Sequence, residues 1–127
     1  MKLPPSEGKI QSECYIWFHN TYPEHRGRLY AINNNSQNAI KGSFNKAMGV
    51  VKGVADMHFI LPAGRIAFLE FKAPGGRQSP DQIKWQEKVE RLGHEYLIIT
   101  SVEGFKGWVK FRLGREKRNS AYWHLQI

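Results

Sequence analysis

Residues 68–80 read FLEFKAPGGRQSP and place one acidic and one basic side chain in an apolar run. Phe68, Leu69 and Phe71 have the bulky apolar side chains of a strand that is covered on both faces. A lone charge in such a strand is costly unless it is paired or bound to a metal ion. Because residues two apart on a strand point the same way, we expect Glu70 and Lys72 side by side on one face.

A capped helix follows this strand. Ser79 is the predicted N-cap, Pro80 occupies the first helical position, and Gln82 completes a capping box. Gly93 is the expected stop. The strand, its Gly-rich turn and the helix therefore form one continuous unit of an α/β fold.

The segment upstream of this unit, ADMHFILPAGRIAFLEFKA at residues 55–73, predicts two strands joined by a turn at residues 62–64. Its two arms are about equally long on either side of Ala63. Asp56 is then expected opposite Glu70 in the hairpin.

The rest of the chain alternates between helix and strand signals. Apolar spacing predicts a helix over residues 8–20 and a short one over 44–53 that ends at Gly53. We expect further strands over 28–33 and 94–101, a weaker helix over 102–113, and a loop in the Asn-rich stretch 32–43. This order predicts an α/β domain, residues 1–127, with a mixed sheet flanked by helices.

Composition narrows the class of protein. A chain of 127 residues with 41% hydrophobic composition suits one domain, and its net charge of +8 favours an anionic partner, nucleic acid first. Cys14 is the only cysteine, which excludes an intramolecular disulfide and a thiolate zinc site and fits a reducing, cytoplasmic setting. No apolar run reaches the length of a membrane span. The five histidines show no metal-ligand spacing, although His58 should share the strand face of Asp56.

The charged residues on this face suggest a metal site. Asp56 and Glu70 would repel each other unless a cation lies between them, and carboxylate oxygens suit Mg²⁺ or Mn²⁺. The ammonium group of Lys72 could then orient or help to deprotonate a water that attacks a phosphodiester. The structural alternative is a Glu70–Lys72 ion pair, with Asp56 capping the turn.

Two stretches, GVVKGVADMHFI (49–60) and GRIAFLEFKAPGGRQSPDQIKWQEKVERLGHEYLII (64–99), resemble the VRR nuclease domain of the PD-(D/E)XK phosphodiesterase superfamily. The resemblance implies a restriction-endonuclease-like core, with Asp56 and Glu70 as acidic metal ligands and Lys72 as the catalytic lysine. It further implies that the carbonyl of Phe71 is a metal ligand and that Gln82 lies at the edge of the active site. The proline usual before the family aspartate is replaced by Ala55, which removes no ligand.

The first helix of such nucleases usually adds one acidic residue. Glu13 is the best candidate here, with Glu7 and Gln11 as alternatives. The expected DNA-contacting cations are Lys41, Lys46, Lys52 and Arg77.

These features lead us to expect a Mg²⁺- or Mn²⁺-dependent DNA endonuclease. Stand-alone family members resemble Holliday junction resolvases, so the resemblance implies branched DNA as substrate and a homodimer. The alternatives are a nuclease for single-stranded or flap DNA and a non-catalytic DNA-binding module with the same fold.

Overall fold

The computed structural model describes residues 5–32 and 46–126, with side chains up to residue 119. Its helices are α1 (Glu7–Thr21), the 3-10 turn η1 (Pro23–His25), α3 (Pro80–Arg91) and α4 (Val102–Gln126). Its strands are β1 (Leu29–Ala31), β2 (Met57–Ile60), β3 (Ile66–Phe71) and β4 (Glu95–Ile99). None of the described helices is long and apolar enough to cross a membrane.

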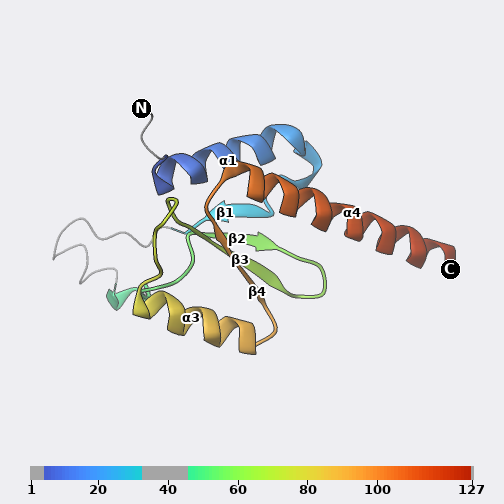
Figure 1. The fold of residues 1–127 in the computed structure, drawn as a ribbon. Helices are drawn as coiled ribbons and strands as arrows, with labels where there is room; N and C mark the ends of the chain where they lie inside the picture. The colour runs from blue at the N-terminus through green and yellow to red at the C-terminus, as the bar shows by residue number, and fades with distance from the viewer. Residues whose placement is uncertain (1–4, 33–45, 127) are drawn as a thin grey trace.

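The strands form one mixed sheet in the order β1-β2-β3-β4 (Figure 1). The first three are antiparallel, and β3 pairs with β4 in parallel. In the β2–β3 hairpin, Met57 faces Leu69 and Ile60 faces Ile66, so the turn is centred on Ala63 as expected. The α/β class and the mixed sheet predicted from the sequence are confirmed.

Helices cover both faces of the sheet. Helices α1 and α4 lie on one face and α3 lies on the other (Figure 1). The larger core lies under α1 and α4 and contains Leu69 and Phe71, whereas Phe68 packs with Ala55 and Val89 under α3. Because side chains alternate along β3, Glu70 belongs to the α3 face with Phe68.

The start of α3 forms as its sequence predicts. The Ser79 side chain accepts a hydrogen bond from the Gln82 N–H, and the Gln82 side chain accepts one from the Ser79 N–H. The helix ends at Arg91, and the chain then turns at Gly93, whose φ of 96° is one that glycine adopts readily. This capping box fixes where the chain turns after the apolar strand.

Two predicted helices differ from the structure. The one expected over 44–53 lies partly outside the described residues, and its end at Gly53 is wrong because the chain leaves the helix in a turn at Met48 and Gly49. The final helix extends far beyond residue 113, since α4 continues to Gln126. Buried Phe105 and Val109 anchor it to the core and outweigh the weakness of Gly104 and Gly107.

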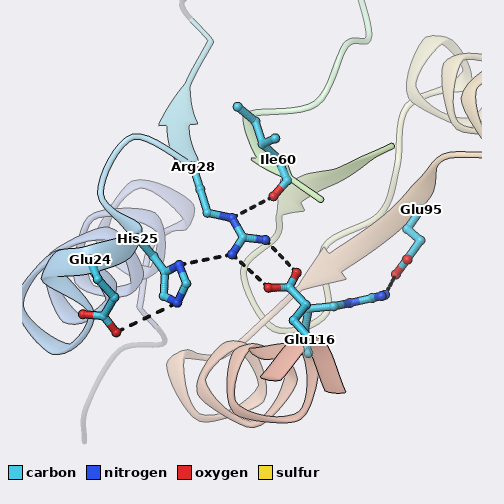
Figure 2. A network of polar contacts seen from close by, with 7 residues as sticks. Glu24, His25, Arg28, Ile60, Glu95 and Glu116 are labelled. Atoms are coloured by element: carbon cyan, nitrogen blue, oxygen red, sulfur yellow. Dashed lines mark hydrogen bonds and ion pairs between the residues drawn. The ribbon is translucent and has the colours of Figure 1, made fainter. Parts of the chain in front are cut away.

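A group of ion pairs ties α4 to the sheet (Figure 2). They lie where β4 begins, at the end of the sheet away from Glu70, which pairs with Ile98. The Arg28 guanidinium donates two hydrogen bonds to the Glu116 carboxylate, at 2.7 and 2.9 Å, and a third to the Ile60 carbonyl at 2.9 Å. Arg112 of α4 pairs with Glu95 at the start of β4. We call Arg28, Arg112, Glu95 and Glu116 the α4 clamp.

Candidate active site

The hairpin places Asp56 beside Glu70. Asp56 immediately precedes β2, and its N–H donates to the Leu69 carbonyl at 3.0 Å, which continues the strand register. Its carboxylate oxygen Oδ2 accepts a hydrogen bond from the Phe71 N–H at 2.7 Å. The side chain of Asp56 is therefore held against the backbone of the strand that carries Glu70.

Glu70 is the buried acidic residue of this strand, with 0% of its surface exposed. Its Oε1 accepts hydrogen bonds from the Tyr96 hydroxyl at 2.5 Å and from the Gln78 amide at 3.0 Å. Its Oε2 is buried and accepts no hydrogen bond from the described residues, and it lies 3.7 Å from the Lys72 ammonium. An oxygen in this state is poorly compensated by the protein and is available to a bound cation.

Lys72 completes the charged group. Its side chain is only 12% exposed, and its N–H donates to the Ile99 carbonyl of β4. The side chains of Glu70 and Lys72 lie on the same face, as their spacing predicts. The ion pair anticipated as the structural alternative is also present, although its distance is long for a direct hydrogen bond.

The electrostatics match two carboxylates that share a confined space. Burial raises the pKa of Asp56, and the charges of Glu70 and Glu7 raise it further, against the opposing effects of the Phe71 N–H and of Lys72. Burial also raises the pKa of Tyr96, as does its hydrogen bond to Glu70, so the phenol remains a proton donor to this carboxylate. Burial lowers the pKa of His58, which favours a neutral imidazole on this face.

Solved structures of other proteins have the same fold as this chain. A solved structure described as a VRR_NUC domain protein has a TM-score of 0.67 and 14% sequence identity, covering 88% of this chain and 91% of that one. A second, described as a VRR_NUC domain, has a TM-score of 0.53 and 18% identity, covering 82% of this chain and 94% of the other. The chain has the VRR_NUC fold. The resemblance in the sequence is thereby confirmed at the level of the fold.

The sequence comparisons are more limited. No protein-family model matches the chain. A curated protein named "Putative nuclease p44", from Acyrthosiphon pisum secondary endosymbiont phage 1, is 38% identical over 50 residues. These residues are 39% of this chain and 54% of that protein, so the match spans about half the length of the relative.

The structure does not bring Glu13 to the carboxylate pair of this VRR_NUC fold. Glu13 is exposed on α1, and its charge acts on Cys14 rather than on Asp56. Glu7, named above as an alternative, does act on Asp56. Within residues 5–32 and 46–119, no three His, Cys, Asp or Glu side chains gather closely enough to hold a metal ion.

A different glutamine from the expected one contacts Glu70. The Gln82 side chain is engaged in the capping box of α3, which was its alternative role. Gln78 instead donates to Glu70, and also to the side-chain amide oxygen Oε1 of Gln86 at 2.8 Å. Gln78 and Tyr96 were missed in the sequence, because the turn and the β4 register that bring them to Glu70 carry no local signal.

The structure describes three of the four basic residues that were predicted to contact DNA. Lys41 lies outside the described residues, whereas Lys46, Lys52 and Arg77 are exposed. A Cβ on Gly53, next to Lys52, would lie 2.6 Å from the Asp81 backbone, so this segment packs against the start of α3. Since Arg77 lies in the turn that leads into α3, Lys52 and Arg77 flank the same part of the VRR_NUC fold.

Proposed function

We propose that the chain is a metal-dependent nuclease that hydrolyses phosphodiester bonds in DNA. The observation that carries this proposal is the buried Oε2 of Glu70, which lacks a hydrogen bond and lies beside a second acidic residue. A cation would compensate this charge. Asp56, Glu70 and the carbonyl oxygen of Phe71 would supply hard oxygen ligands, which Mg²⁺ and Mn²⁺ prefer.

The chain's own residues have distinct roles in this proposal. Lys72 orients the attacking water and stabilises the negative charge that develops on the phosphate. Tyr96 and Gln78 fix the Glu70 carboxylate by holding its Oε1, which leaves Oε2 for the ion. When bound, the divalent ion polarises the phosphate and lowers the pKa of water. Glu7 is better placed than Glu13 to contribute from α1, and a catalytic role for Gln82 now depends on its leaving the capping box.

The net charge of the protein and its similarity to nucleases favour DNA as the substrate. The net charge of +8 suits a polyanion, and the name of the phage relative, like the VRR_NUC fold, points to nuclease chemistry. Branched DNA is our preferred substrate, cut by a homodimer whose two active sites would cleave two strands symmetrically. Lys46, Lys52 and Arg77 would contact the phosphates on either side of the cut.

The test is a cleavage assay on four-way junctions, flaps, single strands and linear duplexes, with Mg²⁺, Mn²⁺ or EDTA. We expect metal-dependent cleavage that falls at least about 100-fold in Asp56→Asn, Glu70→Gln and Lys72→Ala. Glu103→Gln and Lys110→Ala are the matched controls, because they make similar changes at exposed sites on α4 and should leave cleavage intact. Faster cleavage of the four-way junction would support branched DNA as the substrate. Faster cleavage of a flap or a single strand would identify that DNA as the substrate instead.

Two results would contradict the proposal. If the parent protein binds DNA but cuts none of these substrates with either metal, the fold serves as a DNA-binding module. If Glu70→Gln and Lys72→Ala cut as fast as the parent, the reaction occurs elsewhere. An increase in melting temperature with Mg²⁺ that disappears in Asp56→Asn would locate the ion independently of cleavage.

A further inference from the structure

A cavity of about 530 Å³ lies between α1 and the start of the sheet. Its lining includes Gly8, Gln11, Ser12 and Tyr15 from one face of α1, together with Tyr30 of β1 and Met57 of β2. These α1 positions are three or four residues apart, so they face the same side of the helix. The volume falls within the range of small-molecule sites.

The lining has the character of a site for an uncharged, planar group. Tyr15 is 39% exposed, although its side chain is large and mostly apolar. Its ring stacks on His19 and is thereby held in place, whereas the Tyr30 ring packs with His58 on the opposite face of the sheet. A pre-positioned aromatic ring at an open cavity provides a surface on which a base can stack.

The polar groups of the lining are neutral. Among the described residues, the Gln11 amide has no hydrogen-bond partner, which leaves its donors and acceptor to a ligand. The Ser12 hydroxyl donates to the Lys9 carbonyl and retains acceptor capacity. None of the described residues that line the cavity is charged, which favours an uncharged group over a phosphate.

The cavity adjoins the candidate active site on two sides. Met57 directly follows Asp56, and Gly8 directly follows Glu7, whose charge acts on Asp56. Ala31 also lines the cavity, and the N–H of the following residue, Ile32, donates to the Asp56 carbonyl at 2.9 Å. A nucleotide whose phosphate lies at Asp56 could therefore reach the cavity with its base.

We infer that this cavity binds an unpaired nucleobase of the DNA strand, adjacent to the phosphate at the candidate active site. The inference rests on the proposed nuclease function, and it adds a requirement for a base that is not held in a duplex at that position. Stacking on Tyr15 would supply affinity without strong sequence preference, and Gln11 would contact the edge of the base.

Gly8 offers a way to block the cavity without removing any contact. A Cβ at Gly8 would meet no atom within 4 Å, so a side chain there extends into open space. Gly8→Leu should fill part of the cavity while α1 gains helix propensity. Gly8→Ala is the matched control, because it brings the same helix gain with a much smaller side chain.

The experiment measures binding by fluorescence anisotropy in EDTA, where cleavage does not interfere. The probes are a labelled single-stranded DNA and the same backbone with abasic residues. We expect the parent protein to bind the base-bearing strand about 5- to 150-fold more tightly. Gly8→Leu and Tyr15→Ala should lose most of this preference without weakening the abasic strand, while Gly8→Ala, Tyr15→Phe and the exposed-aromatic control Phe111→Ala should keep it.

Each possible failure has a separate meaning. If Gly8→Leu weakens binding of the base-bearing and abasic strands equally, or weakens neither, the inference is overturned even where the parent cleaves DNA. If Gly8→Leu changes the oligomeric state and not the preference for bases, the cavity is a protein-binding surface and the inference is again wrong. If the preference for bases depends on Gly8 but the parent never cleaves, the proposed function fails while the base site stands.

Discussion

At the scale of single residues, Asp56 illustrates a conflict between stability and function. Its pKa is raised by burial and by neighbouring carboxylates, so its ionised form is less favourable in the folded protein than in the unfolded chain. This penalty is fully present above the folded-state pKa and disappears as the pH falls below the unfolded value. The site is therefore destabilising at neutral pH until a cation binds.

We predict that Asp56→Asn raises the free energy of unfolding by about 0.5–2 kcal/mol at pH 7 in EDTA. The amide oxygen can still accept the Phe71 N–H, while the buried charge is removed. Urea denaturation with and without Mg²⁺ measures the change. Asp81→Asn is the control and should lower the free energy of unfolding, because the Asp81 carboxylate stabilises the N-terminal end of α3. A loss of stability in Asp56→Asn without metal would contradict this account.

A second residue-scale prediction concerns Cys14, which is fully buried under α1. Burial raises the pKa of this thiol to about 11, and the charge of Glu13 adds to the effect. Above about pH 9 the unfolded chain ionises while the folded protein keeps its proton, so stability falls as the pH rises toward 11. The expected loss is about 2–3 kcal/mol, measured by denaturation at pH 8 and pH 11. The loss in Cys14→Ala should be smaller by this amount, with a remainder from buried Tyr96, whose raised pKa has the same effect above pH 10. An equal loss in Cys14→Ala and the parent would refute the assignment.

The candidate site was predictable where one element carries it. The spacing of Glu70 and Lys72 and the symmetry of the hairpin about Ala63 sufficed to bring three charged residues together. The donors to Glu70 were not predictable, because Tyr96 comes from a parallel strand whose register is set by tertiary packing. Glu13 was preferred to Glu7 for its place near apolar positions on α1, but Glu13 is exposed and Glu7 is the α1 carboxylate whose charge acts on Asp56.

At the scale of elements, the hairpin turn contains a strained position. Ala63 has a φ of 65° and Gly64 one of 72°, the left-handed conformation that alanine disfavours. The predicted turn formed in the expected place because the strands on either side fix its register. By contrast, the helix expected over 44–53 ended early, since Gly53 is required for close approach to Asp81 and not as a helix stop.

We predict that Ala63→Asn raises the free energy of unfolding by about 0.5–1 kcal/mol, because asparagine tolerates the left-handed region better than alanine. Ala63→Val should lower it by at least a similar amount. Thermal denaturation of both variants measures the difference, and DNA cleavage should not change, since the turn lies at the far end of the hairpin from Asp56. Equal stability of the two variants would contradict the strain.

At the scale of the whole molecule, the two ends of the sheet have separate tasks. The carboxylates lie at the end where β2 begins and β3 ends. The α4 clamp, part of which Figure 2 shows, lies at the opposite end. The Arg28 guanidinium also lies 4.9 Å from the Phe59 ring, so the clamp is continuous with the core. The long helix α4 is thus attached to the end of the sheet where β1 and β4 begin, by groups remote from the chemistry.

This separation predicts that the α4 clamp affects stability and not cleavage. Arg28→Met should lower the free energy of unfolding by about 2 kcal/mol, because it leaves the half-buried Glu116 without its two charge-assisted hydrogen bonds. Glu116→Gln should cost less, and the double variant should cost less than the sum, with a coupling of about 1–2 kcal/mol. Urea denaturation of the four proteins measures this coupling. The cleavage rate per folded molecule should match the parent in each, and a selective loss of cleavage in Arg28→Met would show that the two ends of the sheet are coupled.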